Sequence, residues 1–329
     1  MQRDLVVHPH VTRFRLDRQP VFMVQEGGIM EGRKIHSAHT VMTQGMRLCS
    51  CFRSFPLAAL LLIIAYHPLQ AQVAVDFRSG RLALTTTDLT VPAGPVRLEI
   101  KRTLLSEKGR PGLLGTWWRL SIERRLIKEQ NVVRMEGDVG SILFSREGKS
   151  SVYKNALGER LRIEENGRAL WTKQDGTRET YDGEGRLIEI DYRNFNKVTF
   201  RYGPDKRLGR IEGPKQHFIK LFTDTKGRLL RAEASNGEQI DYQYGGDRLS
   251  QVRINGAEVF RYEYDTRDLL VRIEAPPTGA VEIAYDSQGR VVKRHFADGG
   301  MEQYGYSNAG NELSFTDPMG GVTKRQRSP

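Results

Sequence analysis

Cysteine is nearly absent from this chain of 329 residues, because its two copies, Cys49 and Cys51, both precede residue 52. The remainder can therefore form no disulfide, no cysteine-ligated zinc site and no thiolate nucleophile. Histidine is almost as scarce, since only His217 and His295 follow residue 71, far apart in sequence and without metal-ligand spacing. No metalloprotease, serine-hydrolase or nucleotide-binding motif occurs in a fitting context. We therefore predict no catalytic, cofactor-binding or metal-binding residue, and a protein that is not an enzyme.

Long hydrophobic runs are also missing, apart from Phe55–Tyr66, which is apolar over 12 residues. A membrane-spanning helix needs about 20 apolar residues, whereas the hydrophobic region of a secretory signal needs roughly 7 to 15. Arg47 and Arg53 supply positive charge before the run, and Met46 supplies a start. We expect a signal peptide over residues 46–71, and a buried core helix is the less favoured alternative.

A signal peptide that starts at Met46 leaves residues 1–45 as a non-structural extension or a mis-called start. Cleavage before Gln72 would release a mature chain without cysteine and without a transmembrane segment. The mean hydropathy of -0.52 also excludes a polytopic membrane protein. We therefore expect an exported protein, located in the periplasm, at the cell surface or in the medium.

The charge balance is basic, with 51 Lys and Arg against 40 Asp and Glu and a net charge of +11. Acidic residues are interspersed with the basic ones, a pattern that most often indicates a solvated outer face. Binding to an acidic envelope polymer or to nucleic acid is a minor alternative, which a steep salt dependence would reveal.

What the sequence does contain is a repeat from residue 181 onward. Each copy has an aromatic residue, a turn rich in Gly, Asp, Asn and Lys, and then an aliphatic residue. The seven copies are Tyr181–Leu187, Tyr202–Leu208, Phe222–Leu229, Tyr244–Leu249, Tyr264–Leu269, Tyr285–Val291 and Tyr306–Leu313. Their final aliphatic residues recur every 20 to 22 residues, and this half has no sustained helical periodicity. We therefore predict an all-β region of hairpins, with two strands per copy.

Alternation within these strands predicts which side chains are buried. In Phe260–Tyr264 the rings stand at every second position, with Arg261 and Glu263 between them. Successive side chains point to opposite faces of a strand, so the rings share one face while the charges, with Arg201 and Gln243, share the other. Single-stranded nucleic acid needs rings and basic groups on one face, which disfavours that partner. We expect the rings of successive copies to stack as a continuous ladder in the core.

Two further residue sets have both a structural and a functional interpretation. The repeated acids at the turns are Asp182, Asp224, Asp247, Asp265 and Asp286. Isolated acids lack the clustered oxygen ligands of a calcium site, so we expect them to cap their own turns. Trp117, Trp118 and Trp171 invite a sugar-stacking interpretation, but adjacent tryptophans point to opposite faces of a strand, which favours a packing role.

The Tyr-Asp pairs that begin at Tyr181, Tyr264 and Tyr285, with the Gly-Arg-Leu steps at 185–187 and 227–229, resemble the Rhs or YD-repeat family. The region before them is similar to the domain that precedes YD repeats in bacterial members, in the order of residues 76–82, 87–89, 101–106 and 112–118. The resemblance covers about residues 73–320.

This resemblance implies an all-β fold in which a strip of YD-repeat hairpins curls as a partial shell or solenoid, with a small N-terminal β domain as a plug. We expect that domain at residues 72–165, the repeats at 166–320 and a basic tail at 321–329. The three tryptophans would then pack at the join of plug and shell. Bacterial relatives commonly enclose a variable C-terminal toxin, and similar animal shells belong to cell-surface adhesion proteins.

Residues 316–321 look like the opening of an eighth copy, and Lys324, Arg325 and Arg327 follow them. A strip of about 14 strands would leave an unpaired edge at its last strand. We therefore expect an exported, non-enzymatic shell or scaffold module, a truncated or split member of a toxin-encapsulating system. Its partner would be a C-terminal toxin or further YD repeats encoded separately. The alternative is a cell-surface module that binds glycan or protein through its outer strand faces.

Overall fold

The computed structural model describes residues 72–326 apart from 77, 139, 147, 149, 195, 277, 278 and 308–311. Contacts divide the chain into two units, and all described residues belong to the unit 64–329. The expected extension 1–45, the signal peptide 46–71 and both cysteines lie outside the described residues, so these assignments stay predictions. No helix in the described part is long and apolar enough to cross a membrane.

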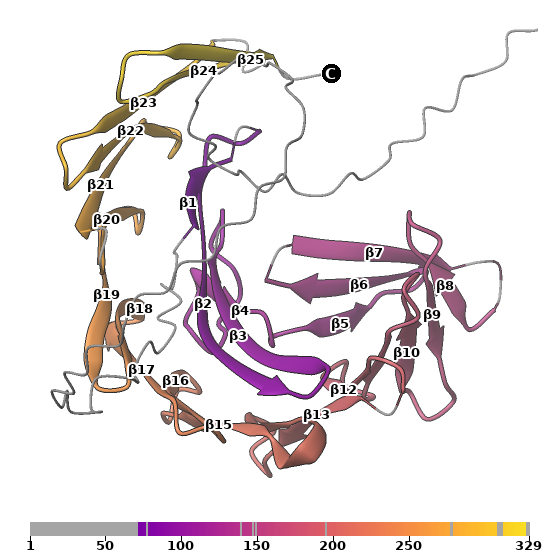
Figure 1. The fold of residues 1–329 in the computed structure, drawn as a ribbon. Coiled ribbons are helices and arrows are strands. Elements are labelled where there is room, and N and C mark those ends of the chain that lie inside the picture. The colour runs from indigo at the N-terminus through magenta and orange to yellow at the C-terminus, as the bar shows by residue number, and fades with distance from the viewer. Residues whose placement is uncertain are drawn as a thin grey trace, which may run out of the picture. The chain divides into compact units, whose positions relative to one another are not determined.

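An antiparallel sheet of four strands comes first in the sequence, and we call it the inner sheet. Its strands are β1 (Gln72–Val75), β2 (Leu82–Ala93), β3 (Val96–Leu104) and β4 (Trp118–Leu120). The long hairpin of β2 and β3 turns at Gly94, whose φ of 72° lies in the left-handed region that glycine tolerates. Figure 1 shows this hairpin inside the curve of the later strands.

The remaining strands form one antiparallel ladder in sequence order, and we call it the wall. Its first strands are β5 (Arg125–Lys128), β6 (Val132–Gly137), β7 (Gly140–Arg146), β8 (Val152–Lys154), β9 (Arg160–Ile163), β10 (Ala169–Thr172), β11 (Arg178–Tyr181) and β12 (Leu187–Asp191). They are followed by β13 (Lys197–Tyr202), β14 (Leu208–Glu212), β15 (Phe218–Thr223), β16 (Leu229–Ala234), β17 (Gln239–Gly245), β18 (Arg248–Ile254) and β19 (Ala257–Tyr264). The last are β20 (Leu270–Ala275), β21 (Gly279–Tyr285), β22 (Val291–Phe296), β23 (Met301–Tyr306), β24 (Glu312–Thr316) and β25 (Val322–Gln326). A short 3₁₀ turn, η1 (Pro214–Gln216), precedes β15. The predicted all-β fold with two strands per repeat is confirmed.

Each repeat turn joins an odd-numbered strand to the next even-numbered one, from β11–β12 to β23–β24. In the first turn Tyr181 pairs with Leu187, and the register shifts between Thr180 and Tyr181. The extra residues of the turn include Gly185, whose φ is 79°. A bulge with a left-handed residue tightens the reversal and increases the strand twist. The Gly-rich turns of the sequence therefore set the hairpin geometry.

Two positions within the predicted repeats are shifted by one residue. Thr223, not Phe222, pairs with Leu229 at the position that tyrosine occupies elsewhere, and the ring of Phe222 is 45% exposed. Likewise Leu270, not Leu269, pairs with Tyr264 and is buried. Both predictions are wrong because they chose the residue by its type, whereas the bulge in the strand register determines which residue takes the paired position.

The first eight strands of the wall return on themselves, and we call them the roll. An isolated antiparallel bridge joins Arg125, at the start of β5, to Arg186, just before β12. The backbone N–H of Leu126 donates to the carbonyl of Gly185 at 2.8 Å, which closes this seam. Inside the roll the rings of Phe144 and Trp171 pack edge to face, with 5.3 Å between their centroids. The roll thus buries its apolar face against itself.

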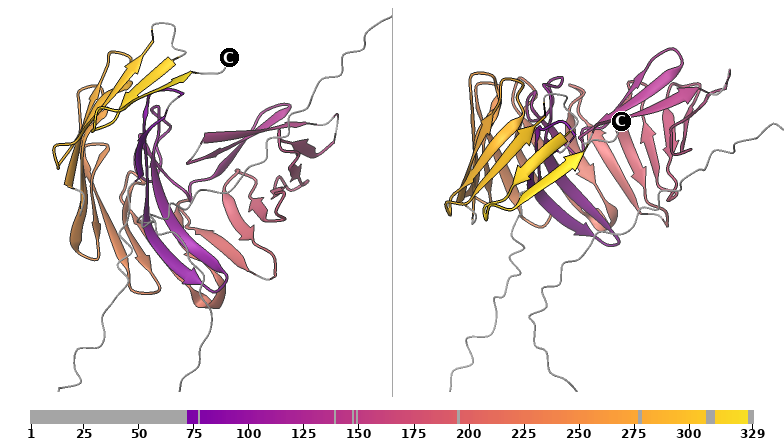
Figure 2. Two further views of the ribbon diagram at one scale, coloured as in Figure 1. Left: turned by 45° about the horizontal axis from the view of Figure 1, so that its top comes forward. Right: turned by 90° about the horizontal axis from the view of Figure 1, so that it is seen from above.

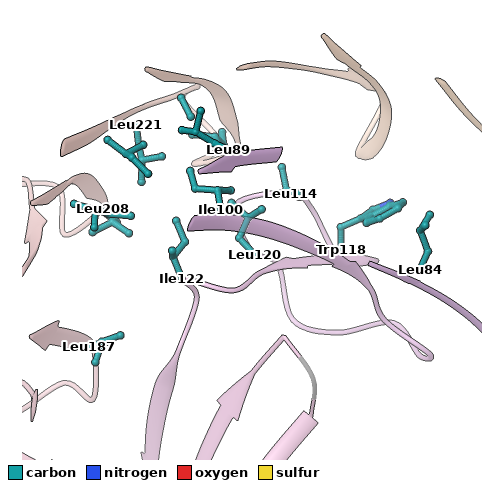
Figure 3. Close-up of a cluster of buried hydrophobic side chains, with 14 of the residues drawn as sticks. Leu84, Leu89, Ile100, Leu114, Trp118, Leu120, Ile122, Leu187, Leu208 and Leu221 are labelled. Carbon is teal, nitrogen blue, oxygen red and sulfur yellow. The ribbon is translucent and has the colours of Figure 1, made fainter. Parts of the chain in front are cut away.

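From β13 onward the wall is an open curve, and Figure 2 shows these strands lying side by side. Its buried face packs on the inner sheet, which confirms the predicted plug-like N-terminal β domain within a partial shell. Figure 3 shows this core, with Leu89, Ile100 and Trp118 near the inner sheet and Leu208 and Leu221 from the wall.

The predicted division of faces is confirmed in the wall. The rings of Phe200, Tyr242, Phe260 and Tyr262 are buried, whereas Arg201, Gln243, Arg261 and Glu263 are exposed. Opposite charges on the outer face lie directly across neighbouring strands, and Arg261 is 2.9 Å from Glu274. The outer face is therefore charged and largely neutralised by cross-strand pairs.

We predict that Gly185→Ala destabilises the protein more than Gly227→Ala, although both glycines take left-handed φ values, 79° and 85°. A Cβ on Gly185 would clash with the carbonyl oxygen of Leu126, whereas on Gly227 its nearest neighbour is Arg207 Nε at 3.4 Å. Both substitutions cost about 1–2 kcal/mol of backbone strain. Only the first also breaks the seam, so chemical denaturation should show an additional loss of about 1 kcal/mol. Equal losses would contradict a stabilising role of the seam.

Candidate functional site

A pair of opposite charges lies buried between the inner sheet and the wall. Asp88 on β2 and Arg102 on β3 form an ion pair, and both side chains are 0% exposed. The register of β2 and β3 shifts between Thr87 and Leu89, so Asp88 is a bulge residue. As a result Asp88 and Leu89 are buried in succession, although neighbours in a regular strand alternate. The bulge therefore turns the carboxylate toward the wall.

The wall completes the hydrogen bonding of this ion pair. The hydroxyl of Tyr242 on β17 donates to Oδ2 of Asp88 at 2.8 Å. Nη2 of Arg102 donates to the hydroxyl oxygen of Tyr262 on β19 at 2.8 Å, and its guanidinium lies 4.5 Å from the ring centroid of Phe260. We call these five residues the junction cluster. Buried charges that are paired and hydrogen-bonded in this way are tolerated in a protein interior.

Burial sets the protonation of the junction cluster. It raises the pKa of Tyr262 to about 12 and the pKa of Tyr242 well above its usual value, so both hydroxyls stay neutral at neutral pH. Burial also raises the pKa of Asp88, while the charge of Arg102 and hydrogen bonds from Arg102 and Tyr242 oppose that increase. The ionised carboxylate therefore depends on the guanidinium beside it. The cluster uses its polar groups to hold two sheets together.

Trp118 makes a second polar link between the two layers. Its indole Nε1 donates to the hydroxyl oxygen of Tyr264 at 2.9 Å, and its ring lies 4.9 Å from that of Tyr262. Trp117 is partly buried against the same core. The predicted packing at the join is confirmed for these two residues. It is wrong for Trp171, which packs inside the roll because β10 belongs to the wall.

Tyrosine hydroxyls connect successive repeats along the wall. In five of the repeats the hydroxyl of the turn tyrosine donates to the carbonyl of the aliphatic residue 15 positions earlier. These pairs are Tyr202–Leu187 at 2.9 Å and Tyr244–Leu229, Tyr264–Leu249, Tyr285–Leu270 and Tyr306–Val291, each at 2.7 Å. The second and last of them also reach the loops of the N-terminal domain, at the carbonyls of Leu113 and Gly80.

Arginines lie between the tyrosines of neighbouring repeats. The guanidinium of Arg186 lies 4.9 Å from the ring centroid of Tyr202, and that of Arg290 lies 4.2 Å from Tyr306. Arg228 and Arg248 stack in the same way on the tyrosines that follow them. The predicted continuous ladder of rings is therefore wrong, because cation–π contacts are interposed between the turn rings.

The turn aspartates cap their own turns, as predicted. Oδ1 of Asp182 accepts the backbone N–H groups of Glu184 and Arg186 at 3.0 and 2.9 Å, and Oδ2 accepts Nε of Arg186 at 2.7 Å. Asp224, Asp265 and Asp286 accept equivalent backbone bonds. Asp247 is the exception, since its side chain is exposed and contacts Lys226 at 3.1 Å.

A second buried carboxylate lies inside the roll. Glu179 is 0% exposed, pairs with Arg124 and with Nζ of Lys173 at 2.6 Å, and accepts the hydroxyl of Tyr181 at 2.5 Å. Like Asp88, this acid is bound by cations and by a tyrosine. The histidines that the sequence singled out lie elsewhere, with Nδ1 of His217 3.3 Å from Oγ of Ser235. His295 is exposed on β22.

Sequence reasoning missed both buried acids. The signal for Asp88 is weak, because a single acid in the Thr-rich segment 85–90 looks like an exposed strand residue. Its bulge, which reverses the facing of the side chain, has no signature in the sequence. Glu179 stands two residues before Tyr181, and this spacing places both side chains on one face of a strand. The sequence therefore did contain a signal that Glu179 faces the same side as the buried ring.

Two family models match the sequence. The model described as Teneurin YD-shell matches residues 138–317, which is more than half of the chain. The model described as a domain of unknown function, DUF6531, matches residues 73–144, and this domain precedes YD repeats. The first match falls on the wall, and the second includes the inner sheet.

Solved structures of toxin complexes are also similar to this chain. One is the crystal structure of TcdB2-TccC3-TEV, with a TM-score of 0.27 and 12% identity over 74% of this chain and 20% of that chain. Another is the Photorhabdus luminescens Tc holotoxin pore, with a TM-score of 0.26 and 12% identity over 74% of this chain and 19% of that chain. The present chain thus spans about a fifth of the length of these chains. No curated relative matches the sequence.

We predict that Arg102→Met destabilises the protein by about 3–5 kcal/mol, because it leaves the Asp88 carboxylate buried without a counter-charge. Adding Asp88→Leu should recover part of that loss, since the double variant buries no charge. Urea denaturation of the two single variants and the double variant gives a double-mutant cycle, with an expected coupling above about 1 kcal/mol. Additive losses would show that the two charges do not stabilise each other.

The hydroxyl bonds give a second prediction, for two tyrosines that differ in one contact. Tyr285→Phe leaves only the Leu270 carbonyl without its bond and should cost about 1 kcal/mol. Tyr264→Phe also removes the acceptor of the buried Trp118 indole, so it should cost about 2–3 kcal/mol. Thermal and chemical unfolding measure both losses. If Tyr285→Phe were the more costly change, the link through Trp118 would not stabilise the junction.

Proposed function

This chain belongs to the teneurin YD-shell family, and we propose that it acts as an exported, non-enzymatic wall segment of a shell. In this role the inner sheet covers the apolar face of the wall, and the junction cluster holds the two layers together. The buried acids support a structural role, because cations and tyrosines bind both of them. The signal peptide expected at residues 46–71 supports export, and cleavage would leave the described residues intact.

The observation that carries this proposal is the outer edge of β25. Oδ1 of Asp317 accepts the N–H groups of Met319 and Gly321 at 2.9 and 2.8 Å, so an eighth turn of the repeat type precedes β25. Within the expected basic tail, Val322–Gln326 therefore lie on a strand. β25 pairs with β24, and no strand register among residues 72–326 involves its other edge. An unpaired edge is a template for another strand.

We propose that β25 accepts a strand from further YD repeats encoded on a separate chain, as in a split toxin-encapsulating system. The partner strand would pair antiparallel to β25 and extend the wall by the same ladder. Val322 is 63% exposed on this edge strand and Met319 is 96% exposed beside it, so apolar surface is available for the added hairpin. The partner would contribute the toxin or other cargo.

The experiment uses the whole chain, expressed in a secreting bacterial host together with the YD-repeat chain encoded beside it. Mass spectrometry of the exported protein should find an N-terminus at or near Gln72. Complex formation, measured by light scattering, should slow hydrogen exchange at alternate amides of Val322–Gln326 and leave β12 unchanged. An intact Met1 on exported protein would contradict the export proposal. A complex without protection of β25, or no complex, would contradict the edge proposal.

The alternative function, a cell-surface module that binds glycan, is favoured by one observation. On the outer face of β9–β13 basic side chains outnumber acidic ones, and this face is distinct from the edge of β25.

A further inference from the structure

The outer face of the wall is charge-matched over most of its repeats. Basic and acidic side chains stand directly opposite each other on neighbouring strands and form ion pairs. These pairs are Arg231–Asp241 at 2.7 Å, Arg261–Glu274 at 2.9 Å and Arg272–Glu282 at 2.8 Å. Matched pairs of this kind stabilise a sheet slightly and leave little net field at its surface.

The strands β9–β13 depart from this pattern. A cross-strand row runs from Arg160 through Thr172 to Arg178, and then through Asp191 to Lys197. Arg160 and Arg178 are exposed and make no ion pair with any described residue. Arg162, beside them on β9, is also exposed and likewise unpaired within the described part of the chain. The row therefore presents more positive charge than the wall neutralises.

The one acid in the row, Asp191, stands directly opposite Arg178 but forms no ion pair with it. Oδ1 of Asp191 accepts the backbone N–H of Arg193 at 3.0 Å, in the turn that follows β12. Lys197 pairs with Glu189 at 3.0 Å on an exposed part of the strand, and such a pair exchanges readily with solvent or with a ligand. Arg178 thus keeps its five N–H donors available for a bound anion.

The part of this row from Thr172 to Lys197 lines an open groove of about 600 Å³, and Arg160 lies on the neighbouring strand, next to Thr172. Thr172, Arg178, Asp191 and Lys197 form its floor from strands β10–β13, and Arg193 lies in the turn at its end. Arg193 and the next residue, Asn194, have φ values of 73° and 52°, a left-handed conformation that is costly for arginine. The turn therefore holds a basic side chain at the groove at some cost to stability. Strain of this kind concentrates at binding sites.

The spacing of the cations selects the type of anion. Arg160 and Arg178 stand two strands apart, as do Arg178 and Lys197, which places their Cα atoms about 9.5 Å from each other in each pair. That spacing suits a polysaccharide whose alternate sugar rings present their acidic groups toward the same side. Single-stranded nucleic acid needs exposed rings for its bases, and the rings of Trp171 and Tyr181 on these strands face the interior of the roll.

We infer that the outer face of β9–β13 binds an acidic polysaccharide, whose carboxylate or sulfate groups pair with Arg160, Arg178 and Lys197. Arginine forms two parallel hydrogen bonds with either group, which favours it over lysine for such recognition. The site lies on the outer face of the wall, so occupation leaves the junction cluster and the edge of β25 unchanged. The inference does not depend on the proposed shell function.

The test measures binding of the full chain to polygalacturonate, which is carboxylated, to heparin, which is sulfated, and to oligothymidylate. Isothermal titration at low and at physiological salt should show binding to at least one polysaccharide, weakened by salt. The double variant Arg160→Gln/Arg178→Gln should lose about tenfold in affinity. The matched control, Arg231→Gln/Arg272→Gln, removes the same charge from the ion-paired part of the outer face and should lose less than about twofold.

The outcomes separate the possible explanations. Preference between the two polysaccharides identifies which acidic group the site recognises. Equal losses in the two double variants would show that net charge alone causes binding and would overturn the inference. Tighter binding of oligothymidylate than of both polysaccharides, or no binding of polysaccharide at low salt, would overturn it as well.

Discussion

The wall has one apolar face, and that face has to be covered along its whole length. A flat antiparallel sheet cannot cover its own apolar face, because all the side chains of that face point the same way. The chain meets this constraint in two ways. Strands β5–β12 close into the roll and bury their apolar side chains against each other. Strands from β13 onward curve around the inner sheet, which supplies the opposing apolar layer.

The two solutions are joined by polar contacts placed inside the apolar layers. Asp88 and Arg102 occupy a position that aliphatic residues could fill with less desolvation cost. The charges add alignment between the layers, because the ion pair is hydrogen-bonded by one tyrosine of β17 and one of β19, which have to lie opposite to it. Glu179 has an equivalent place within the roll. Packing provides the bulk of the stability, and these clusters define how the layers are aligned.

The periodic part of the molecule could be predicted from the sequence. Turn residues and alternation identified the hairpins, the number of strands per repeat and the buried face, because each depends on neighbours within a few residues. The errors at Phe222 and Leu269 arose where residue type and register disagree. Asp88 and the closure of the roll could not be found, since a bulge and a contact between Leu126 and Gly185 depend on the assembled sheet.

The hydroxyl bond from tyrosine to carbonyl spans 15 residues in every repeat that forms it. That span contains the hairpin between repeats, whereas the turn that follows the tyrosine lies outside it. All variation in repeat length therefore occurs in the latter turn, which is one residue shorter at Tyr244 and one longer at Tyr306. During divergence of such sequences, insertions and deletions would accumulate in the turn that follows the tyrosine. The hairpin between repeats would keep a constant length.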